Sequence, residues 1–577
     1  MALSFIKKIA DFLSKKTGQN KEDLILLIEH PPSLELGNYS FPCFGTAKVL
    51  KKNPDEVARE LALQFPVSKY FKKAEAKGPY LNFFIDPLSY QTELISEILN
   101  QKENYGASNI GQNKTILIEY SSPNIAKPFH VGHFRATIIG NSLKKIHEAL
   151  GYKVIGINYL GDWGTQFGKL IVAYKKWGAK AQLKKDPIKY LNSLYIQFHS
   201  EAEKNPSLED EARLWFKKCE EKNKEALALW KEFRELSLKE FKKIYAELDV
   251  HFDEISGESL YDEKIAPTIS YIKSKIQTQI SEGALIINLE KYKMPPALLL
   301  RKDGASLYLT RDIAALLDRY NRYHFDKILY VVGDTQNLHF QQLFKLIELM
   351  GNPWAKECHH IAFGQIRLKD QKMSTRKGTA ILLEEVLDKS IELIAKIIEE
   401  KNASLKGKQE VAQKVGSGAI IFADFSSRRI KNVTFDWDVI LNPDGDTGPY
   451  VLYTYARASS ILRKAQGKAP TSFLSSDLIG ELTGESTLLE SQEEQELMKA
   501  LECFPKTLTA AAHDFEPSYI ATTLLDVSKL FNRFYHEHRV IQEDEALQAS
   551  RLKLVSATRQ VLKNGLNLLG IQEVEEL

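Results

Sequence analysis

The sequence predicts an α/β protein in three parts: an α+β domain over residues 1–104, a parallel-sheet domain over 105–445 and an all-helical bundle over 446–577. Strands rich in β-branched residues alternate with helices in the middle of the chain. A long, charged helical stretch interrupts that alternation, and helical periodicity alone runs on to the last residue. The chain of 577 residues is also too long for one ordinary domain.

Composition is that of a globular protein: 44% of the residues are hydrophobic and 27% are charged. No apolar run approaches the roughly eighteen residues that a membrane helix needs, and the first residues lack the features of a secretory signal. The net charge of +3 means that a polyanion would bind to local basic faces. Cys43, Cys219, Cys358 and Cys503 are far apart and form no C-x-x-C pair. We therefore expect neither a zinc site nor a disulfide framework, and a reducing cytoplasm as the location.

The first part of the chain mixes helix and strand signals. Its opening segment, "MALSFIKKIADFLSKKTGQN", has the spacing of an amphipathic helix. A turn-rich loop and further helical periodicity follow, and "GPYLNFFID" from Gly78 has the composition of a strand. The polar segment "NQKENYGASNIGQNK" is rich in turn formers, so we expect the α+β domain to end there, at about residue 104.

Strands and helices alternate from residue 105 onward. "TILIEY" is a short strand followed by a loop and an apolar helix, and "YKVIGINYLGDWG" is a strand ending in a Gly-rich turn. This order predicts a parallel sheet whose functional site lies at the carboxyl ends of the strands. From about residue 170 the pattern becomes helical and highly charged. It predicts a helical insertion over about 170–290, with the charges on solvated faces.

Sheet-like signals return in "ALIINL", "ALLLRKDGASLYLT" and "DKILYVVGD". "HHIAFGQIRL" adds one more strand, and the basic loop "KDQKMSTRKGTA" follows it. Beyond Asp446 the pattern is helical, with no strand pattern, so we expect the chain to end in a helical bundle.

Two histidines lie in "IEYSSPNIAKPFHVGHFRATIIGN", between the first strand of the sheet and its helix. As zinc ligands, His130 and His133 would need an evident third ligand, and the chain has no H-E-x-x-H motif. As structural histidines, they would be satisfied by core or backbone contacts. Phosphate binding, the third interpretation, suits their place at a helix N-terminus after a strand. There free N–H groups favour anions, and Gly132 lets a nucleotide approach.

Phosphate chemistry predicts a second basic element that reaches the same nucleotide. "KMSTR" supplies one, with Lys372, the hydroxyl of Ser374 and Arg376. Basic loops are common, so this motif is weak alone, but its combination with the histidine loop is specific. Imidazole N–H donors and these cations would stabilise charge on a reacting phosphate.

The two motifs resemble the HIGH and KMSKS signatures of class I aminoacyl-tRNA synthetases. Further blocks are similar, in order, to those of arginyl-tRNA synthetases: "SSPNIAKPFHVGHFR", "NYLGDWGTQFG", "LYLTRDIAA", "GDTQNLHFQQL", "MSTRKGT" and "DTGPYVLYTYAR". The resemblance covers nearly the whole chain. It implies a Rossmann-like catalytic domain, an N-terminal additional domain that contacts the tRNA elbow, and a C-terminal helical anticodon-binding domain.

The resemblance also implies a two-step reaction. L-arginine and ATP, accompanied by Mg²⁺, give arginyl-adenylate and pyrophosphate. The arginyl group then moves to the 2′-hydroxyl of the terminal adenosine of tRNA-Arg. Positioning and charge stabilisation dominate such chemistry. We expect a monomeric, cytoplasmic enzyme of translation without structural zinc or membrane attachment. The sequence leaves open whether arginine activation needs tRNA.

By resemblance, nucleotide and phosphate contacts fall to His130, Gly132, His133, Gly333, Asp334, His339, Lys372, Met373 and Ser374. This chain has Thr375 where the KMSKS motif has its second lysine. Lys127, just before the HIGH block, matches a lysine thought to substitute for it in this family. Arg376 or Lys377 could share that task, and Asp334 could equally be a turn residue.

The residues that match the family's arginine contacts are Glu119, Ser121, Asn124, Tyr308, Asp312 and Gln336. A guanidinium is a planar fork of donors, best met by carboxylates with a flat aromatic ring alongside. Asp312 shares a face with Tyr308 if a helix begins there, so we expect this pair at the arginine side chain. Asn124 and Gln336 are expected at the α-amino and carboxylate end. Any one acid alone would more often be a surface or capping residue.

Candidate tRNA contacts are Asn38, Tyr39, Tyr450, Tyr455 and Arg457, with Phe534 and Tyr535 as further rings. Aromatic residues at helical spacing are more often core, so that alternative stays open for each ring. Arginyl enzymes often close with Met, whereas this chain ends in "QEVEEL". The contacts of its terminus with an anticodon loop are therefore left open.

Three other functions are weighed against this one. A HIGH-type synthetase for a different amino acid would lack the block with Tyr308 and Asp312, and the zinc-dependent ones carry Cys and His ligands. A non-catalytic tRNA-binding paralogue would have lost the histidines or the basic loop, and both are present. A helical scaffold built on the charged insertion leaves the loop motifs unexplained.

Overall fold

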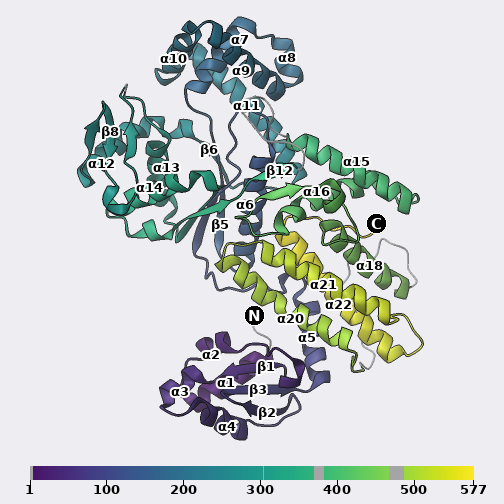
Figure 1. The fold of residues 1–577 in the computed structure, drawn as a ribbon. Coiled ribbons are helices and arrows are strands. Elements are labelled where there is room, and N and C mark those ends of the chain that lie inside the picture. The colour runs from purple at the N-terminus through teal and green to yellow at the C-terminus, as the bar shows by residue number, and fades with distance from the viewer. Residues whose placement is uncertain (1–3, 303, 369–381, 467–486) are drawn as a thin grey trace.

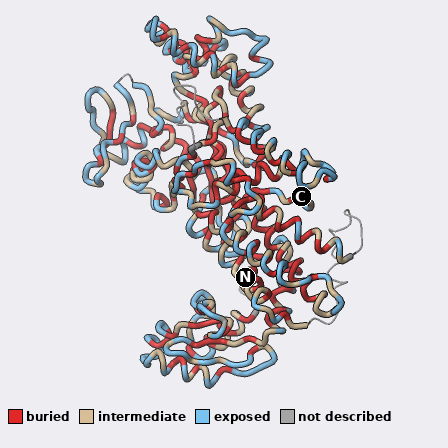
Figure 2. Tube along the Cα trace, turned by 45° about the vertical axis from the view of Figure 1, so that its right-hand side comes forward, coloured by how far each residue is buried: buried red, intermediate tan, exposed pale blue. Residues whose placement is uncertain are grey.

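The structure is a computed structural model that describes residues 4–302, 304–368, 382–466 and 487–577 (Figure 1). A small N-terminal domain lies at the bottom of the view, the parallel sheet lies at the centre, and the C-terminal helices lie beside it. Figure 2 shows that buried residues run through the middle of each part. No helix among these residues is long and apolar enough to cross a membrane. The expected fold class is confirmed.

The N-terminal domain is built on a three-stranded antiparallel sheet in the order β1-β3-β2. Its strands are β1 (Tyr39–Pro42), β2 (Phe71–Lys77) and β3 (Tyr80–Ile85). Its helices are α1 (Ser4–Thr17), α2 (Lys21–Leu27), α3 (Phe44–Leu50) and α4 (Pro54–Gln64). The opening helix and the strand at "GPYLNFFID" are thus where the sequence predicts them. α5 (Pro87–Gln101) leads out of the domain, and Asp86 caps it by accepting from the Ser89 N–H.

The central sheet has five strands in the order β11-β10-β4-β5-β6. The strands are β4 (Thr115–Glu119), β5 (Lys153–Leu160), β6 (Glu254–Gly257), β10 (Lys327–Gly333) and β11 (Cys358–Phe363). Every neighbouring pair is parallel, so all the carboxyl ends meet at one edge. The chain order runs outward from β4 in both directions, which makes the carboxyl end of β4 a topological switch point.

α6 (Val131–Ala149) follows β4 and packs closely against it. A Cβ at Gly140 would lie 2.2 Å from the Cβ of Tyr120, so only glycine lets the helix pass this close to the end of β4. The close approach fixes the start of α6, and with it the histidine loop, over the edge of the sheet.

The charged stretch forms a helical insertion made of α7 (Thr165–Trp177), α8 (Lys180–Lys185), α9 (Pro187–Lys204), α10 (Ser207–Glu220) and α11 (Lys224–Glu247). The prediction that the insertion runs on to about residue 290 is wrong in one respect. The chain returns to the central sheet at β6, which pairs with β5. Four residues are too few to carry a periodicity that the sequence could reveal.

A second excursion follows β6, with α12 (Ile265–Lys275) and a separate antiparallel sheet of β7 (Gln279–Ser281), β8 (Ala284–Ile287) and β9 (Ala297–Leu300). The strand signals in "ALIINL" and "ALLL" therefore do not rejoin the central sheet, and "YLT" begins a helix. α13 (Tyr308–Tyr323) and α14 (Asn337–Leu349) then flank β10 in the sequence. Local apolar runs predict a strand without revealing which sheet it joins.

Among the described residues that follow β11, most are helical. β12 (Ile366–Leu368) pairs with β13 (Val433–Phe435), so "HHIAFGQIRL" contains two strands rather than one. The helices are α15 (Leu383–Lys401), α16 (Lys408–Phe425), α17 (Trp437–Ile440), α18 (Gly448–Gln466), α20 (Gln492–His513), α21 (Ser518–Glu537) and α22 (Glu545–Leu568). In Figure 1, α18, α20, α21 and α22 lie together as the expected bundle.

A buried ion pair ties the histidine-loop helix to this helical part. Arg135 on α6 places its Nε 2.8 Å from the Oδ1 of Asp424 on α16, and both side chains are fully buried. Arg135 also donates from Nη1 to the carbonyl oxygen of Lys431 at 2.8 Å. Two charges in this setting stabilise the fold only while they stay paired.

We predict that Asp424→Ala destabilises the protein by about 3–5 kcal/mol, because it leaves the Arg135 charge buried and uncompensated. The double variant Arg135→Met with Asp424→Leu, which removes both charges, should cost less than the single change. Chemical denaturation with circular dichroism measures both. A single variant as stable as the wild type would contradict the assignment.

Candidate active site

The loop that follows β4 is fastened across the edge of the sheet to the loop after β5. Asn124 forms an isolated parallel bridge with Gly161. Gly161 donates to the carbonyl oxygen of Pro123 at 3.2 Å, and its own carbonyl accepts from the Ile125 N–H at 3.3 Å. A Cβ on Gly161 would lie 2.1 Å from Asn124 Oδ1, so the two loops fit only with glycine there. Asn124 therefore lies at the switch point, where the sequence predicts a substrate contact.

The histidine pair caps α6. His130 is the N-cap residue, and its Nδ1 accepts from the Gly132 N–H at 3.1 Å. His133 Nδ1 accepts in turn from the His130 N–H at 3.3 Å. The two rings stack with centroids 3.7 Å apart. Because each Nδ1 accepts, a neutral ring carries its proton on Nε2. Two Nε2–H donors are thus available at a helix N-terminus.

Burial keeps both rings neutral. It lowers the pKa of His130 to about 4, and the nearby charge of Lys127 adds to the effect. The pKa of His133 lies well below its ordinary value, because the ring is buried and because His130 and Lys127 lie near it. Burial also lowers the pKa of Lys127, whose Nζ lies 5.3 Å from the ring centre of Tyr195. Hydrogen-bond donation to an anion, rather than a fixed positive charge, is the role this geometry gives the histidines.

Ser121 links the end of β4 to two helices. Its Oγ lies 2.8 Å from the hydroxyl of Tyr245 on α11 and 2.8 Å from the Oγ1 of Thr137 on α6. Asn158 on β5 donates to the same Tyr245 hydroxyl at 3.0 Å. Ser121 is buried within this network. Its observed partners position the histidine helix, while its predicted contact with arginine stays a prediction.

Acidic groups gather near the carboxyl end of β4, where the start of α13 brings Asp312 close to Glu119 and Glu258. Asp312 Oδ2 lies 2.7 Å from His339 Nε2 on α14. The sequence predicts these two residues for different substrates, and the structure brings them into contact. Tyr308, one helical turn before Asp312, is 60% exposed. The helix starts at Tyr308, so the ring and the carboxylate lie one turn apart, as their spacing predicts.

Glu119 has an internal partner. Its Oε2 lies 2.5 Å from Nη1 of Arg319, and both side chains are buried. Burial raises the pKa of Glu119, and the Arg319 charge opposes that rise. The rings of Tyr159 and Tyr330 lie 5.0 and 5.9 Å from the guanidinium carbon of Arg319. The arginine that Glu119 meets in this structure is therefore Arg319 of its own chain.

Glu258 is a site residue that the sequence did not reveal. It follows β6 at the carboxyl edge of the sheet, and Arg311 Nη1 donates to its Oε2 at 3.1 Å. Burial raises the pKa of Glu258 to about 8; Arg311 opposes this, while Asp312 and Asp162 add to it. The only signal was an acid after the unrecognised strand in "EISGESLYDE". A carboxyl group with a pKa near neutrality ionises readily when a cation binds beside it, so Glu258 suits a cationic ligand.

The end of β10 is open. A Cβ on Gly333 would meet nothing closer than 3.9 Å, and Asp334 and Gln336 follow in a short 3-10 turn with Gln336 exposed. These residues lie at the edge of the sheet next to β4. The predicted contacts of Gly333 and Asp334 with the nucleotide, and of Gln336 with arginine, stay predictions.

The basic loop lies outside the described residues, including Lys372, Met373, Ser374, Arg376 and Lys377. The chain that follows it returns to the histidine loop. Leu382 forms an isolated bridge with His130, and the Leu383 N–H donates to the carbonyl oxygen of Phe129 at 3.0 Å.

Two of the expected tRNA contacts are buried. Tyr39 and Tyr455 have no exposed surface, so neither ring can stack on a base in this structure, and the core alternative holds for both. Phe534 is buried as well. Asn38 accepts from the Ile85 N–H at 2.9 Å and joins the loop before β1 to β3. The sequence pattern could not separate these rings from exposed ones because burial depends on what packs on each ring: α20 on Tyr39, and α22 with the end of the chain on Tyr455.

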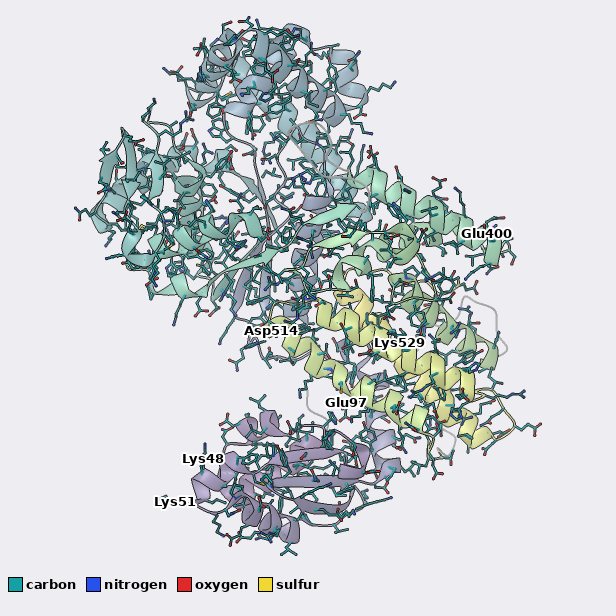
Figure 3. All side chains as sticks on the ribbon, viewed as in Figure 1. Lys48, Lys51, Glu97, Glu400, Asp514 and Lys529 are labelled. Carbon is teal, nitrogen blue, oxygen red and sulfur yellow. The ribbon has the colours of Figure 1, made fainter. Side chains whose placement is uncertain are left out.

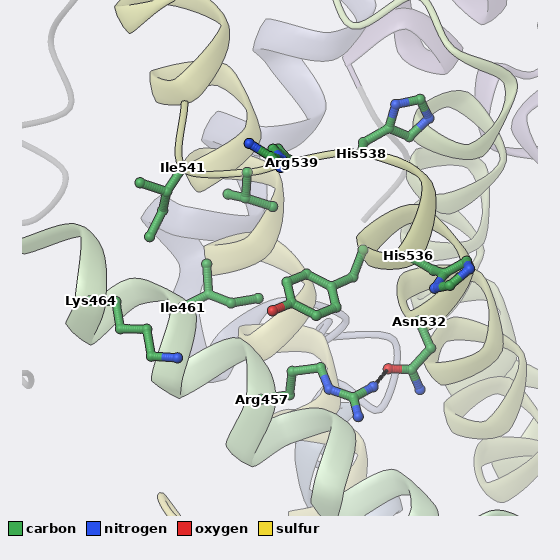
Figure 4. A pocket seen from close by; sticks show the side chains of 10 residues that line it. Arg457, Ile461, Lys464, Asn532, His536, His538, Arg539 and Ile541 are labelled. Atoms are coloured by element: carbon green, nitrogen blue, oxygen red, sulfur yellow. Dashed lines mark hydrogen bonds between the residues drawn. The ribbon is translucent and has the colours of Figure 1, made fainter. Parts of the chain in front are cut away.

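Arg457 and Tyr535 lie at the surface of the helical bundle and line a cavity of about 500 Å³ between α18 and α21 (Figure 4). Arg457 points toward Asn532 and hydrogen-bonds to its Oδ1, and its guanidinium carbon lies 5.7 Å from the Tyr535 ring centre. Lys464 and Arg539 add positive charge to the lining. Tyr450 is half-buried at the start of α18.

The fold, a parallel sheet with a switch point followed by a helical bundle, is that of a class I aminoacyl-tRNA synthetase, as comparison with known proteins shows. Family models match three successive stretches of the chain. They are the arginyl-tRNA synthetase N-terminal domain over residues 4–85, the catalytic domain of class I (R) tRNA synthetases over 94–437, and the DALR anticodon-binding domain over 451–577.

Similar proteins cover the whole chain. The arginine–tRNA ligase of Alkaliphilus metalliredigens is 48% identical over 574 residues, 99% of this chain and 100% of that one. That of Clostridium perfringens is 47% identical over 577 residues, 100% of both chains. The solved arginyl-tRNA synthetase of Thermus thermophilus superposes with a TM-score of 0.80 at 25% identity over 100% of both chains. The chain belongs to the arginyl-tRNA synthetase family, and the resemblance seen in its sequence is confirmed.

We predict that His130 and His133 stay neutral, with the proton on Nε2, from pH 9 down to about pH 5, because burial disfavours the charged ring. Nitrogen-15 NMR of histidine-labelled protein, assigned with His130→Gln, reports the tautomer directly. Protonation of either ring near the ordinary value of about 6.5 would contradict this view of the site.

Proposed function

We propose that this chain is an arginine–tRNA ligase that uses MgATP to activate L-arginine and then charges tRNA-Arg in the cytoplasm, acting as a monomer. The observation that carries the proposal is that Asp312 and Glu258 lie at the same edge of the sheet from which β4 leads into the loop of the neutral histidine donors. Carboxylates suit a guanidinium, and N–H donors suit phosphates. One crevice would then hold the two substrates that must react.

The first step forms a mixed anhydride. A carboxylate oxygen of arginine attacks the α-phosphorus of ATP in line, the bond to the bridging oxygen breaks, and pyrophosphate leaves with the electron pair. The Nε2–H groups of His130 and His133 donate to phosphate oxygens as charge grows on them. Lys127, close by, contributes positive charge, and Lys372 and Ser374 act at the pyrophosphate end. Magnesium enters as part of the MgATP substrate, held mainly by phosphates and water.

The nucleotide and the amino acid share the edge of the sheet. Gly132, Gly333 and Asp334 border the nucleotide, and the predicted role of Met373 as a further nucleotide contact is kept as part of the proposal. A Cβ on residue 132 would lie 2.9 Å from the His130 ring, so glycine is favoured at that position. His339 acts through Asp312, its hydrogen-bond partner, as well as lying near the nucleotide.

Arginine recognition rests on a cation site. Tyr308 lies along the guanidinium, Asp312 and Glu258 face its N–H groups, and Asn124 and Gln336 hold the α-amino and carboxylate end. Glu119 helps indirectly, by holding Arg319 under the site. Displacement of Arg311 from Glu258 would let the substrate guanidinium take its place.

The second step transfers the arginyl group. The 2′-hydroxyl oxygen of the terminal adenosine attacks the carbonyl carbon of the adenylate, AMP leaves with the bridging oxygen, and the hydroxyl proton is lost. The chain must hold a long RNA for this. The groove of Arg457, Tyr535 and Lys464 offers a cation and an exposed ring to anticodon bases, with Tyr450 nearby.

The N-terminal domain offers a pair of exposed rings other than Tyr39, the ring that the sequence predicts for the tRNA elbow. Phe44 and Tyr80 are both exposed and meet edge to face with centroids 5.8 Å apart. Lys48 and Lys51 lie on the outer end of the same domain (Figure 3). This face, rather than the buried Tyr39, suits contact with the tRNA elbow, and Asn38 serves it by holding the neighbouring loop to β3.

ATP–pyrophosphate exchange with each amino acid, with and without total tRNA, tests the proposal. We expect exchange with arginine alone among the amino acids. Exchange only in the presence of tRNA would add that activation needs the RNA, and exchange without it would remove that requirement. Exchange with another amino acid, or none from a folded protein that still binds tRNA, would refute the proposal.

Asp312→Ala should raise the KM for arginine about 100-fold, because a half-buried ionic partner of the guanidinium is lost. Asp318→Ala is the matched control, since Asp318 lies on the same helix and pairs with Lys264 and Arg322 instead. Circular dichroism verifies folding of both. An Asp312→Ala enzyme with unchanged KM for arginine would contradict the pocket.

A further inference from the structure

One carboxylate joins the N-terminal domain to the helical bundle. Glu502 lies on α20, and its side chain is 4% exposed. The hydroxyl of Tyr39, on β1, donates to its Oε1, and the hydroxyl of Tyr90, on α5, donates to its Oε2 at 2.5 Å. Two elements, β1 and α5, therefore donate to one acceptor group on α20. The contact with Glu502 explains why Tyr39 is buried.

His30 completes the surroundings of this carboxylate. Its Nε2 lies 3.8 Å from Glu502 Oε2, and its Nδ1 lies 3.1 Å from the carbonyl oxygen of Asn38. A carbonyl only accepts, so Nδ1 carries the proton and Nε2 turns a lone pair toward Glu502. Burial lowers the pKa of His30, which keeps the ring neutral. The titratable and charged groups that face Glu502 are His30, Tyr39, Tyr90, Tyr105, Lys499 and Cys503.

α5 is fastened to the bundle by other bonds. Gln91 donates to the carbonyl oxygen of Thr487 at 3.0 Å and accepts from the Leu489 N–H at 2.8 Å. Tyr105, just after α5, donates to the carbonyl oxygen of Leu501 at 3.0 Å. These contacts bind α5 to the bundle without involving the sheet of β1, β2 and β3.

The sheet itself depends on Glu502. α1 to α4 and the sheet pack mainly on one another, and Figure 1 shows this domain set apart from the catalytic domain. A cavity of about 250 Å³ lies beside the joint, lined by His30, Lys72, Tyr90, Lys499 and Glu502 among others. Because open space lies next to this interface, its few specific hydrogen bonds are what limit rotation of the N-terminal domain on the bundle.

We propose that Glu502 is a positioning residue for tRNA, which fixes the orientation of the N-terminal domain on the helical bundle by binding Tyr39 and Tyr90 together. The inference rests on the proposed function. One rigid RNA would have to reach the face of Phe44 and Tyr80 and the groove of Arg457 at the same time. A fixed spacing raises the effective concentration of the second contact once the first has formed.

The charge of Glu502 gives an independent readout. Burial raises its pKa from 4.5 to about 7, while the tyrosine hydroxyls and Lys499 oppose the rise. The folded state therefore holds the proton more tightly than the unfolded state does. Its contribution to stability is fully present below about pH 4.5 and is lost as pH rises through about 7. The free energy of unfolding of the wild type, relative to Glu502→Gln, should fall over that range.

Steady-state aminoacylation with varied tRNA-Arg tests the proposal on the full-length chain. Glu502→Leu should raise the KM for tRNA at least about tenfold, since each hydrogen bond to a charged acceptor is worth about that factor. The KM for arginine and the kcat should change less than about twofold. The double variant Tyr39→Phe with Tyr90→Phe should act in the same direction. Glu502→Gln should be milder, because an amide accepts from one hydroxyl and donates to the other.

Glu496→Gln is the matched control. It makes the same change on the same helix, but Glu496 binds Gln492 and Arg533 at the surface of the bundle. It should keep the wild-type KM for tRNA and, between about pH 5 and 8, the wild-type pH dependence of stability, because the pKa of Glu496 lies below its ordinary value and Glu496 stays ionised over that range. Small-angle X-ray scattering should show a wider spread of shapes for Glu502→Leu than for this control.

Several results would overturn the inference. They are a folded Glu502→Leu enzyme with the wild-type KM for tRNA, an equal rise in the KM values for tRNA and arginine, and a flat pH difference between wild type and Glu502→Gln. If Glu502→Leu does not fold, the tyrosine double variant decides the question by the same criteria. A wild-type enzyme that charges no tRNA would instead refute the proposed function.

Discussion

Parallel pairing of β4 with both β5 and β10 is the constraint on which the site depends. Because the strands run the same way, every connection leaves the sheet at one edge, and the chain diverges from β4 in both directions. The histidine loop with Asn124 reaches that edge from β4, and Glu258 reaches it from β6. Residues more than a hundred positions apart thus lie along one edge, where the proposed crevice would form.

Burial sets the chemistry of that crevice. It keeps His130 and His133 neutral, which leaves each ring an Nε2–H donor and avoids the repulsion of fixed charges near Lys127. Where a full charge is buried, a partner is supplied, as for Glu119 with Arg319. Glu258 is intermediate between a neutral group and a fully paired charge, because Arg311 offsets only part of the effect of burial on its pKa. The carboxyl group can therefore bind another cation.

The three parts of the chain act on one another through a few polar contacts. Arg135 joins the histidine helix to α16, and Leu382 joins the end of the basic loop to His130. Glu502 joins the N-terminal sheet to the bundle. A substrate as long as tRNA touches several of these parts at once, so their relative placement bears on binding as directly as the residues at the crevice do.

The sequence by itself determined the parallel sheet, the histidine loop at a helix start, the face shared by Tyr308 and Asp312, and the terminal bundle, because each leaves a local pattern of spacing or composition. Only the tertiary structure decided that β6 returns to the sheet, that Glu258 lies at the carboxyl edge paired with Arg311, and that Tyr39 is an interior residue bound to Glu502. A four-residue strand has no readable period, and the burial of a side chain is set by what packs on it. Partners that lie hundreds of residues away leave no trace in the local sequence.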